Sequence, residues 1–226
     1  MKRTGLAVAL ALGMMSHSVM AKTLNVVTSF SILGDITRQV GGDHVKVTTL
    51  VGPDGDPHTF EPSPKDSAAL SKADVVVVNG LGLEGWLDRL VKASGFKGQL
   101  VVASTGVKTH TLEEDSKTVT DPHAWNSAAN GALYAQNILS GLVNADPEDK
   151  VALEASGKPY IKQLTQLDNW AKTRFSQIPQ EKRKVLTSHD AFGYFSRAYG
   201  VTFMAPQGLS SESEASAAQV AEIINQ

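Results

Sequence analysis

The chain has 226 residues, of which 42% are hydrophobic, and it contains no cysteine. Its fold therefore depends on packing without disulfide bonds, and its length suits one large domain or two small ones. With 21 basic and 23 acidic side chains the formal net charge is −2, which argues against nucleic acid as a partner because such binding needs a basic face.

The first 21 residues have the composition of a secretory signal peptide. Lys2 and Arg3 form a positive start, the apolar run 6–15 is too short to span a bilayer, and Val19-Met20-Ala21 suits cleavage. A membrane anchor or a buried helix is the alternative. Without residues 1–21 the chain keeps 19 basic and 23 acidic side chains, a net charge of −4. No cysteine is present for lipid attachment at the cleavage site, so we expect export by this signal to the periplasm.

Short β-branched runs follow and alternate with amphipathic stretches. Strands are predicted at 24–28, 45–51, 75–79, 100–104, 185–188 and 201–205. The four consecutive valines from Val75 indicate a strand that is buried on both faces. This alternation predicts an α/β fold of parallel sheets with helices on both faces.

The helices of this pattern have recognisable ends. Apolar residues recur at helical spacing after the first strand: Phe30, Leu33, Ile36 and Val40. The Gly41-Gly42 pair should end this helix. Ser63 followed by Pro64 is typical of an N-cap with proline at the first helical position.

One stretch departs from the alternation. From Pro147 to about Gln177 the chain is polar and helical without a strand signal, and we expect Gly157 and Pro159 to bend or interrupt it near its start. A helix of about 20 to 30 residues would span roughly 30 to 45 Å. We interpret the stretch as a connector between two α/β lobes, with an ordinary surface helix of one domain as the alternative.

The predicted organisation has four parts: a signal peptide at 1–21, an N-terminal lobe at 22–146, a connecting helix at 147–178 and a C-terminal lobe at 179–226. After residue 183 only two strands and two helices are predicted, the last over 215–226. A stable parallel lobe normally has more strands. We therefore expect an incomplete second lobe and a C-terminally truncated chain.

Three of the six histidines stand where a predicted strand gives way to a turn-rich loop. His58 follows Gly-Asp-Pro, His123 follows Asp-Pro and precedes Trp125, and His189 precedes a predicted helix that Asp190 could cap. Parallel strands bring their C-terminal ends to one crevice, where ligands bind. Three neutral imidazoles there indicate a transition-metal site, although each histidine taken alone could be a surface residue without a role.

The other titratable side chains near these loops have a different pattern. His44 begins a strand, and His110 lies in a polar loop beside three acids, so we expect neither to bind metal and His110 to be solvated. Glu61 could be a general base or a spare ligand, but a solvated residue before a helix is the preferred interpretation.

Four stretches carry motifs: 55–66 (GDPHTFEPSPKD), 121–125 (DPHAW), 188–195 (SHDAFGYF) and 208–217 (GLSSESEASA). Together they resemble the periplasmic metal-binding proteins of bacterial ABC importers for zinc and manganese, and the resemblance runs from about residue 22 to the last residue. It implies two α/β lobes joined by one long rigid helix, with metal between them. It also implies His58, His123 and His189 as ligands, and a fourth ligand, usually aspartate, beyond residue 226.

The resemblance implies a monomeric solute-binding protein, and not an enzyme, that captures a divalent metal with high affinity and delivers it to an ABC permease in the inner membrane. Histidine at the third ligand position favours zinc, whereas a carboxylate there would suit manganese. Residues 108–120 contain only His110, unlike the histidine-rich loop of many zinc importers. We expect zinc, with manganese second. A zinc hydrolase with three histidines and a water, or a metal-binding surface adhesin, is the alternative.

Overall fold

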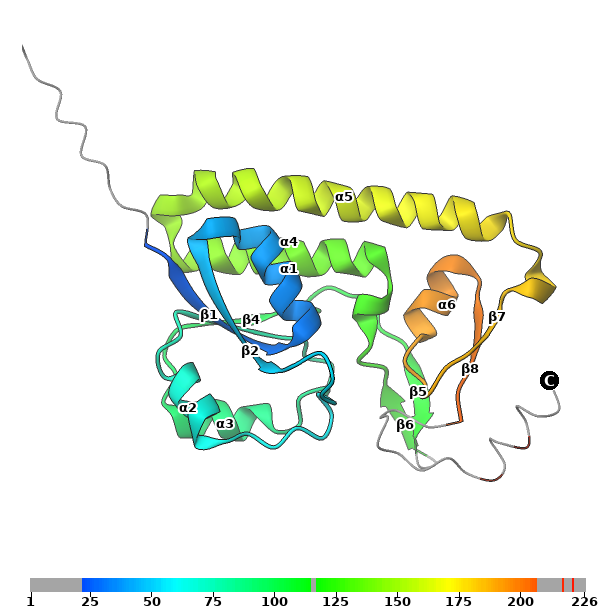
Figure 1. Ribbon diagram of the computed structural model, residues 1–226, viewed down its shortest axis with the longest axis horizontal. Helices are drawn as coiled ribbons and strands as arrows, with labels where there is room; N and C mark the ends of the chain where they lie inside the picture. Colours follow the sequence, from blue (N-terminus) through cyan, green and yellow to red (C-terminus); the bar gives the residue numbers. More distant parts are fainter. Residues whose placement is uncertain (1–21, 115–116, 207–216, 218–220, 222–226) are drawn as a thin grey trace, which may run out of the picture.

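The computed structural model describes residues 22–114, 117–206, 217 and 221 (Figure 1). A four-stranded parallel sheet, here called the first sheet, has the strand order β2-β1-β3-β4. Its strands are β1 (Leu24–Phe30), β2 (Val45–Val51), β3 (Val75–Val78) and β4 (Gln99–Val102). These strands confirm the predicted runs, with ends that differ by no more than two residues.

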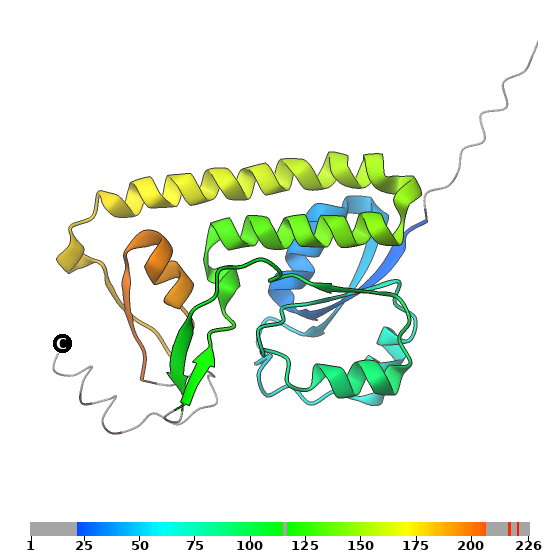
Figure 2. The same ribbon diagram turned by 180° about the vertical axis from the view of Figure 1, so that it is seen from behind.

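Helices cover both faces of the first sheet, as predicted (Figures 1 and 2). One face carries α1 (Ser31–Gly41) and α4 (Ala128–Ala145), and the other carries α2 (Pro64–Leu70) and α3 (Leu87–Ser94). Short 3₁₀ turns lie at η1 (Gly42–His44), η2 (Ala124–Asn126), η3 (Pro147–Asp149) and η4 (Gln180–Lys182). Helix α4 was not identified from the sequence.

The sequence signals for these elements work as expected. The four valines of β3 are at most 2% exposed, which fits a strand covered on both faces. Helix α1 ends at Gly42, whose φ of 53° is a conformation that glycine adopts without a steric penalty. Helix α2 begins with the predicted cap, in which Ser63 and Asp66 hydrogen-bond each other's backbone in a capping box.

Helix α5 (Lys150–Ser176) is 27 residues long and runs across the whole molecule (Figure 1). The expected interruption at Gly157 and Pro159 is wrong, because the helix continues through both. Gly157 is buried, and a Cβ there would lie 3.1 Å from Leu139 and 3.2 Å from Val40, so the missing side chain lets α5 approach α1 and α4. Pro159 is exposed, and water can bind the carbonyl that loses its helical partner.

A second, smaller sheet lies beneath the C-terminal half of α5 (Figure 2). It pairs β7 (Lys184–Leu186) with β8 (Thr202–Met204) in parallel, and α6 (Gly193–Tyr199) connects the two strands. Ala171 of α5, Tyr199 and Val201 form its buried core. The α/β class with parallel sheets and one long helix is thus confirmed, and this second sheet has the two strands that were predicted after residue 183.

An antiparallel hairpin lies between the two sheets in both views (Figures 1 and 2). It consists of β5 (Thr111–Glu114) and β6 (Lys117–Thr120), where the sequence analysis expected a polar loop. That expectation is wrong. Leu112 pairs with Val119 across the strands, but charged and polar neighbours mask this apolar pair in the sequence.

Several expectations fall outside the described residues. They are the signal peptide at 1–21, the motif 208–217 apart from residue 217, and the helix 215–226, of which only residues 217 and 221 are described and both are helical. Within the described ranges, no helix combines the length and the apolar character needed to cross a membrane.

Two residues near the start of α5 test how this helix is held. Leu153 is 0% exposed, whereas Val151 is 81% exposed. Replacing Leu153 by Ala should lower the free energy of unfolding by about 2–5 kcal/mol, because it leaves a cavity between helices. The matched Val151→Ala change should alter it by no more than about 0.5 kcal/mol. Urea denaturation of both variants measures this difference, and equal losses would show that α5 does not pack through Leu153.

Candidate metal centre

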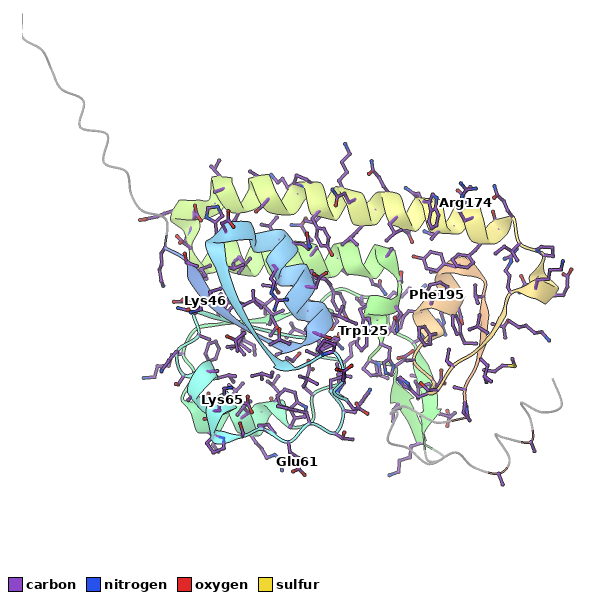
Figure 3. The ribbon with its side chains drawn as sticks, viewed as in Figure 1. Lys46, Glu61, Lys65, Trp125, Arg174 and Phe195 are labelled. Atoms are coloured by element: carbon purple, nitrogen blue, oxygen red, sulfur yellow. The ribbon has the colours of Figure 1, made fainter. Side chains whose placement is uncertain are left out.

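Three separate loops bring His58, His123 and His189 to one hollow of about 180 Å³ between the two sheets. His58 lies between β2 and α2, His123 between β6 and η2, and His189 between β7 and α6. The hollow is also lined by Phe30, Ile32 and Trp125, so Trp125 forms part of the pocket wall as predicted. Figure 3 places Trp125 in the middle of the molecule, where the two parts meet.

Two of the imidazoles are already at the spacing of metal ligands. The Nε2 atoms of His58 and His123 lie 3.1 Å apart. Two nitrogens that bind one tetrahedral zinc ion at 2.0–2.1 Å are about 3.3 Å apart. The ring centroids are 5.1 Å apart for this pair and 5.5 Å apart for His123 and His189. The third ring is therefore next to the pair.

The third nitrogen is not aligned with the other two. Among the described residues, no group of three or more histidine, cysteine, aspartate or glutamate side chains is placed so that all of them could hold one ion. His189 lies with its Nδ1 3.3 Å from the hydroxyl of Ser188. The structure thus presents a close pair of imidazoles with a third ring beside it.

His123 is the most buried of the three, with 1% of its surface exposed. Its Nδ1–H donates to Oδ1 of Asp121 at 2.8 Å, and its backbone N–H donates to the same oxygen at 2.9 Å. With the proton on Nδ1, the Nε2 lone pair of His123 is free and accepts from the Nε2–H of His58. Asp121 therefore determines which nitrogen His123 directs into the hollow.

The loop that carries His123 is anchored to the first sheet. Asn79, directly after β3, donates through Nδ2 to the carbonyl of Pro122 at 2.9 Å, and it accepts from the hydroxyl of Tyr134 at 2.5 Å. The buried Glu84 accepts from the backbone N–H of Asn79 at 2.7 Å. Because Asn79 and Tyr134 are fully buried, this network restrains the backbone on which His123 stands.

The loop that carries His58 is held at two points. The backbone N–H of His58 donates to Oδ1 of Asp56 at 2.8 Å. The indole of Trp86, in the turn before α3, donates to the carbonyl of Pro57 at 2.8 Å. A loop dense in turn residues is therefore tied to the face of the sheet that α3 covers.

Burial and mutual repulsion keep two of the imidazoles neutral. Burial, followed by the neighbouring His123, lowers the pKa of His58 to about 4. The pKa of His189 is lowered for the same two reasons. Metal ligation requires the unprotonated ring, so this setting favours the form that can bind an ion.

The structure corrects the expectation for His110. Its side chain is only 7% exposed, and its ring centroid lies 4.1 Å from that of Tyr194, so the prediction of a solvated loop residue is wrong. The hairpin that was not predicted is the reason, since it turns His110 inward. Asp190 does not cap α6, which begins after Phe192 without a side-chain cap.

Two other residues lie away from the hollow. Glu61 is exposed and points outward at the edge of the molecule (Figure 3). His44 lies with its Nδ1 2.5 Å from Asp149, on the opposite side of helix α1 from the hollow. Asp121 and Asn79 are the site residues that the sequence analysis missed, and the only sequence signal for Asp121 is its place in the motif 121–125.

The family model "Zinc-uptake complex component A periplasmic" (ZnuA) matches residues 26–226. The chain is 38% identical over 208 residues to the manganese ABC transporter substrate-binding lipoprotein scaA of Streptococcus gordonii, covering 89% of this chain and 67% of the relative. It is 37% identical over 202 residues to the manganese-binding lipoprotein MntA of Halalkalibacterium halodurans, covering 89% of this chain and 66% of the relative. The chain thus spans about two thirds of these relatives.

Solved structures share the fold. The periplasmic zinc-binding protein TroA from Treponema pallidum matches with a TM-score of 0.82 and 30% identity, over 90% of this chain and 73% of that one. A manganese-bound periplasmic metal-binding protein from Candidatus Liberibacter asiaticus matches with a TM-score of 0.80 and 30% identity, over 90% and 75% of the two chains. The chain belongs to the ZnuA family of metal ABC transporter substrate-binding proteins. Because these are transport proteins and not enzymes, the hydrolase alternative is set aside.

The lowered pKa of His58 predicts how the metal-free protein responds to acid. Between about pH 6.5, the value of an unfolded histidine, and about pH 4, the unfolded chain binds a proton at residue 58 that the folded chain does not. Stability contributed by neutral His58 is therefore present above this window and is lost as the pH falls through it. Urea denaturation from pH 7 to pH 4.5, with chelator present, should show a smaller loss for His58→Asn than for the wild type. Parallel curves for the two proteins would contradict this prediction.

Proposed function

We propose that the protein captures a divalent transition metal, zinc in preference to manganese, at His58, His123 and His189, and delivers it to the permease of an ABC importer. The observation that carries the proposal is the pair of Nε2 atoms 3.1 Å apart, with a third imidazole next to it, in a hollow between two sheets. Membership of the metal-binding family supports the same role.

Binding starts from the prepared pair. His123 directs a free Nε2 lone pair into the hollow because Asp121 holds its other ring proton. His58 holds a proton on Nε2 in the metal-free state, and an arriving ion replaces the hydrogen bond between the two rings. Neutral His58 can move that proton to Nδ1, so binding there requires no net release of a proton.

His189 completes the set by adjustment of its side chain. It lies on the loop between β7 and α6, and only the hydroxyl of Ser188 contacts its Nδ1 among the hydrogen bonds of the described residues. A small rotation of the ring would bring a nitrogen towards the ion. Because His189 belongs to the second sheet and the other two belong to loops of the first part, the ion would join the two parts of the molecule.

The donor set supports zinc. All three proposed ligands are imidazoles, which suit zinc, whereas manganese prefers carboxylate, carbonyl and water oxygens. For a given nitrogen site, zinc also binds more tightly than manganese in the general order of divalent metals. The names of several relatives refer to manganese, so the choice of metal is the part of the proposal that most needs measurement.

The place of action follows from the family and the first residues. The family description is periplasmic, and the signal-like residues 1–21 predict export. We therefore place metal capture in the periplasm and the permease in the inner membrane. The organisation into an N-terminal lobe at 22–146, a connecting helix at 147–178 and a C-terminal lobe at 179–226 is part of this proposal.

Alanine variants test the ligand assignment. His58→Ala, His123→Ala and His189→Ala should each weaken zinc binding at least about tenfold, because each removes one nitrogen donor from the ion. His44→Ala is the matched control and should bind as the wild type does, since His44 contacts Asp149 away from the hollow. Calorimetric titration of metal-stripped protein gives the affinities. Wild-type affinity in His189→Ala would remove that residue from the site.

A competition experiment tests the choice of metal. Metal-stripped protein dialysed against equal concentrations of zinc and manganese should retain mainly zinc when measured by mass spectrometry of metals, because three nitrogens hold zinc more tightly. A preference for manganese would overturn the zinc assignment but leave metal capture intact. Binding of neither ion would contradict the proposed function as a whole.

A further inference from the structure

His110 and Asp121 form a cross-strand pair at the base of the β5–β6 hairpin. Thr111 pairs with Thr120 in the antiparallel register, and one step further the backbone N–H of Asp121 donates to the carbonyl of His110 at 3.0 Å. Side chains of such opposed residues lie on the same face of the hairpin. The hairpin therefore delivers the His110 ring to the carboxylate that orients His123.

The contact fills the remaining side of that carboxylate. Oδ1 of Asp121 accepts both hydrogen bonds from His123, whereas Oδ2 has no hydrogen bond within the described residues and lies 3.4 Å from Nε2 of His110. Both side chains are buried, at 1% and 7% exposed. A buried carboxylate oxygen without a donor is costly, and His110 provides the nearest N–H group among these residues.

The other side of this pair is closed by α6. The ring of Tyr194 packs on His110 with centroids 4.1 Å apart, and its hydroxyl donates to the backbone carbonyl of Asp121 at 2.8 Å. A Cβ at Gly193 would lie 2.8 Å from Oδ2 of Asp121 and would also collide with the His110 ring. The pair is therefore enclosed between the hairpin and the first turn of α6.

We propose that His110 is a positioning residue for the metal centre: it fixes the plane of the Asp121 carboxylate and so holds His123 in its Nδ1–H form. This inference rests on the proposed function of the His58–His123–His189 site. Gly193 and Tyr194, which enclose His110, follow His189 by only a few residues in the chain. His110 thus also links the orientation of His123 to the segment that carries the third ligand.

Pure packing is the competing explanation, and two substitutions separate it from positioning. His110→Phe keeps a ring of similar size against Tyr194 but removes the N–H group that faces Asp121. His110→Gln keeps a side-chain N–H donor but removes the ring. If packing alone matters, Phe should be the milder change; if the contact with Asp121 matters, Gln should be.

The first measurement is made on metal-free protein at neutral pH. Long-range ¹H–¹⁵N correlation spectra report the tautomer of each histidine, and the His123 signals are assigned by comparison with His123→Ala. We expect a single Nδ1–H form in the wild type and in His110→Gln, and a mixture of tautomers in His110→Phe. An unchanged Nδ1–H form in His110→Phe would overturn the proposal.

The second measurement is zinc affinity by calorimetric titration. Loss of a residue that orients a metal ligand typically lowers affinity about 10- to 100-fold, so His110→Phe should weaken binding by at least about tenfold and His110→Gln by less. His44→Phe, which replaces the histidine of another His–Asp contact, is the matched control and should bind as the wild type does. Wild-type affinity in His110→Phe would overturn the proposal.

Two further arms keep the result interpretable. If His110→Phe does not fold, His110→Met replaces it, because methionine also lacks a donor but adapts to irregular space, and the same outcomes apply. His58→Ala is titrated in parallel. Wild-type zinc affinity in His58→Ala would contradict the proposed metal site, whereas the tautomer of His123 in metal-free protein would still decide whether His110 positions that ring.

Discussion

The hydrogen bond between the buried imidazole of His123 and the carboxylate of Asp121 is the interaction on which the site depends. It holds one ring proton of His123 on Nδ1 and leaves Nε2 free in the hollow. Without it, the 3.1 Å approach of His123 to His58 would have no defined donor and acceptor. The same bond connects the proposed ligands to the packing of the fold, because Asp121 also contacts the hairpin and α6.

The fold supports this bond from both sides. On the side of the first sheet, Asn79 and Tyr134 hold the carbonyl of Pro122, so the backbone between Asp121 and His123 is fixed from below. On the side of the second sheet, Tyr194 holds the carbonyl of Asp121. Helix α5 packs against α1 and α4 at one end and α6 at the other, and so spans both parts (Figure 1). The metal-binding role thus follows from where two packed units meet.

Much of the fold could be predicted from the sequence, because the strands are short β-branched runs whose burial leaves a clear pattern. The three histidines were recognised from their turn-rich motifs and their places after strands. The hairpin could not be recognised, since its one apolar pair, Leu112 and Val119, lies among charged residues. The inward position of His110 depends on that hairpin. The continuity of α5 through Pro159 depends on which side of the helix faces water, which periodicity alone does not determine.

The central claim is that His58, His123 and His189 bind one ion together, and a crystal structure of the zinc-loaded protein tests it most directly. Anomalous diffraction on either side of the zinc absorption edge locates the ion independently of the protein atoms. The account predicts one strong peak in the hollow, about 2.0–2.1 Å from a nitrogen of each of the three imidazoles. A peak elsewhere, or a peak in the hollow to which His123 contributes no nitrogen, would contradict it.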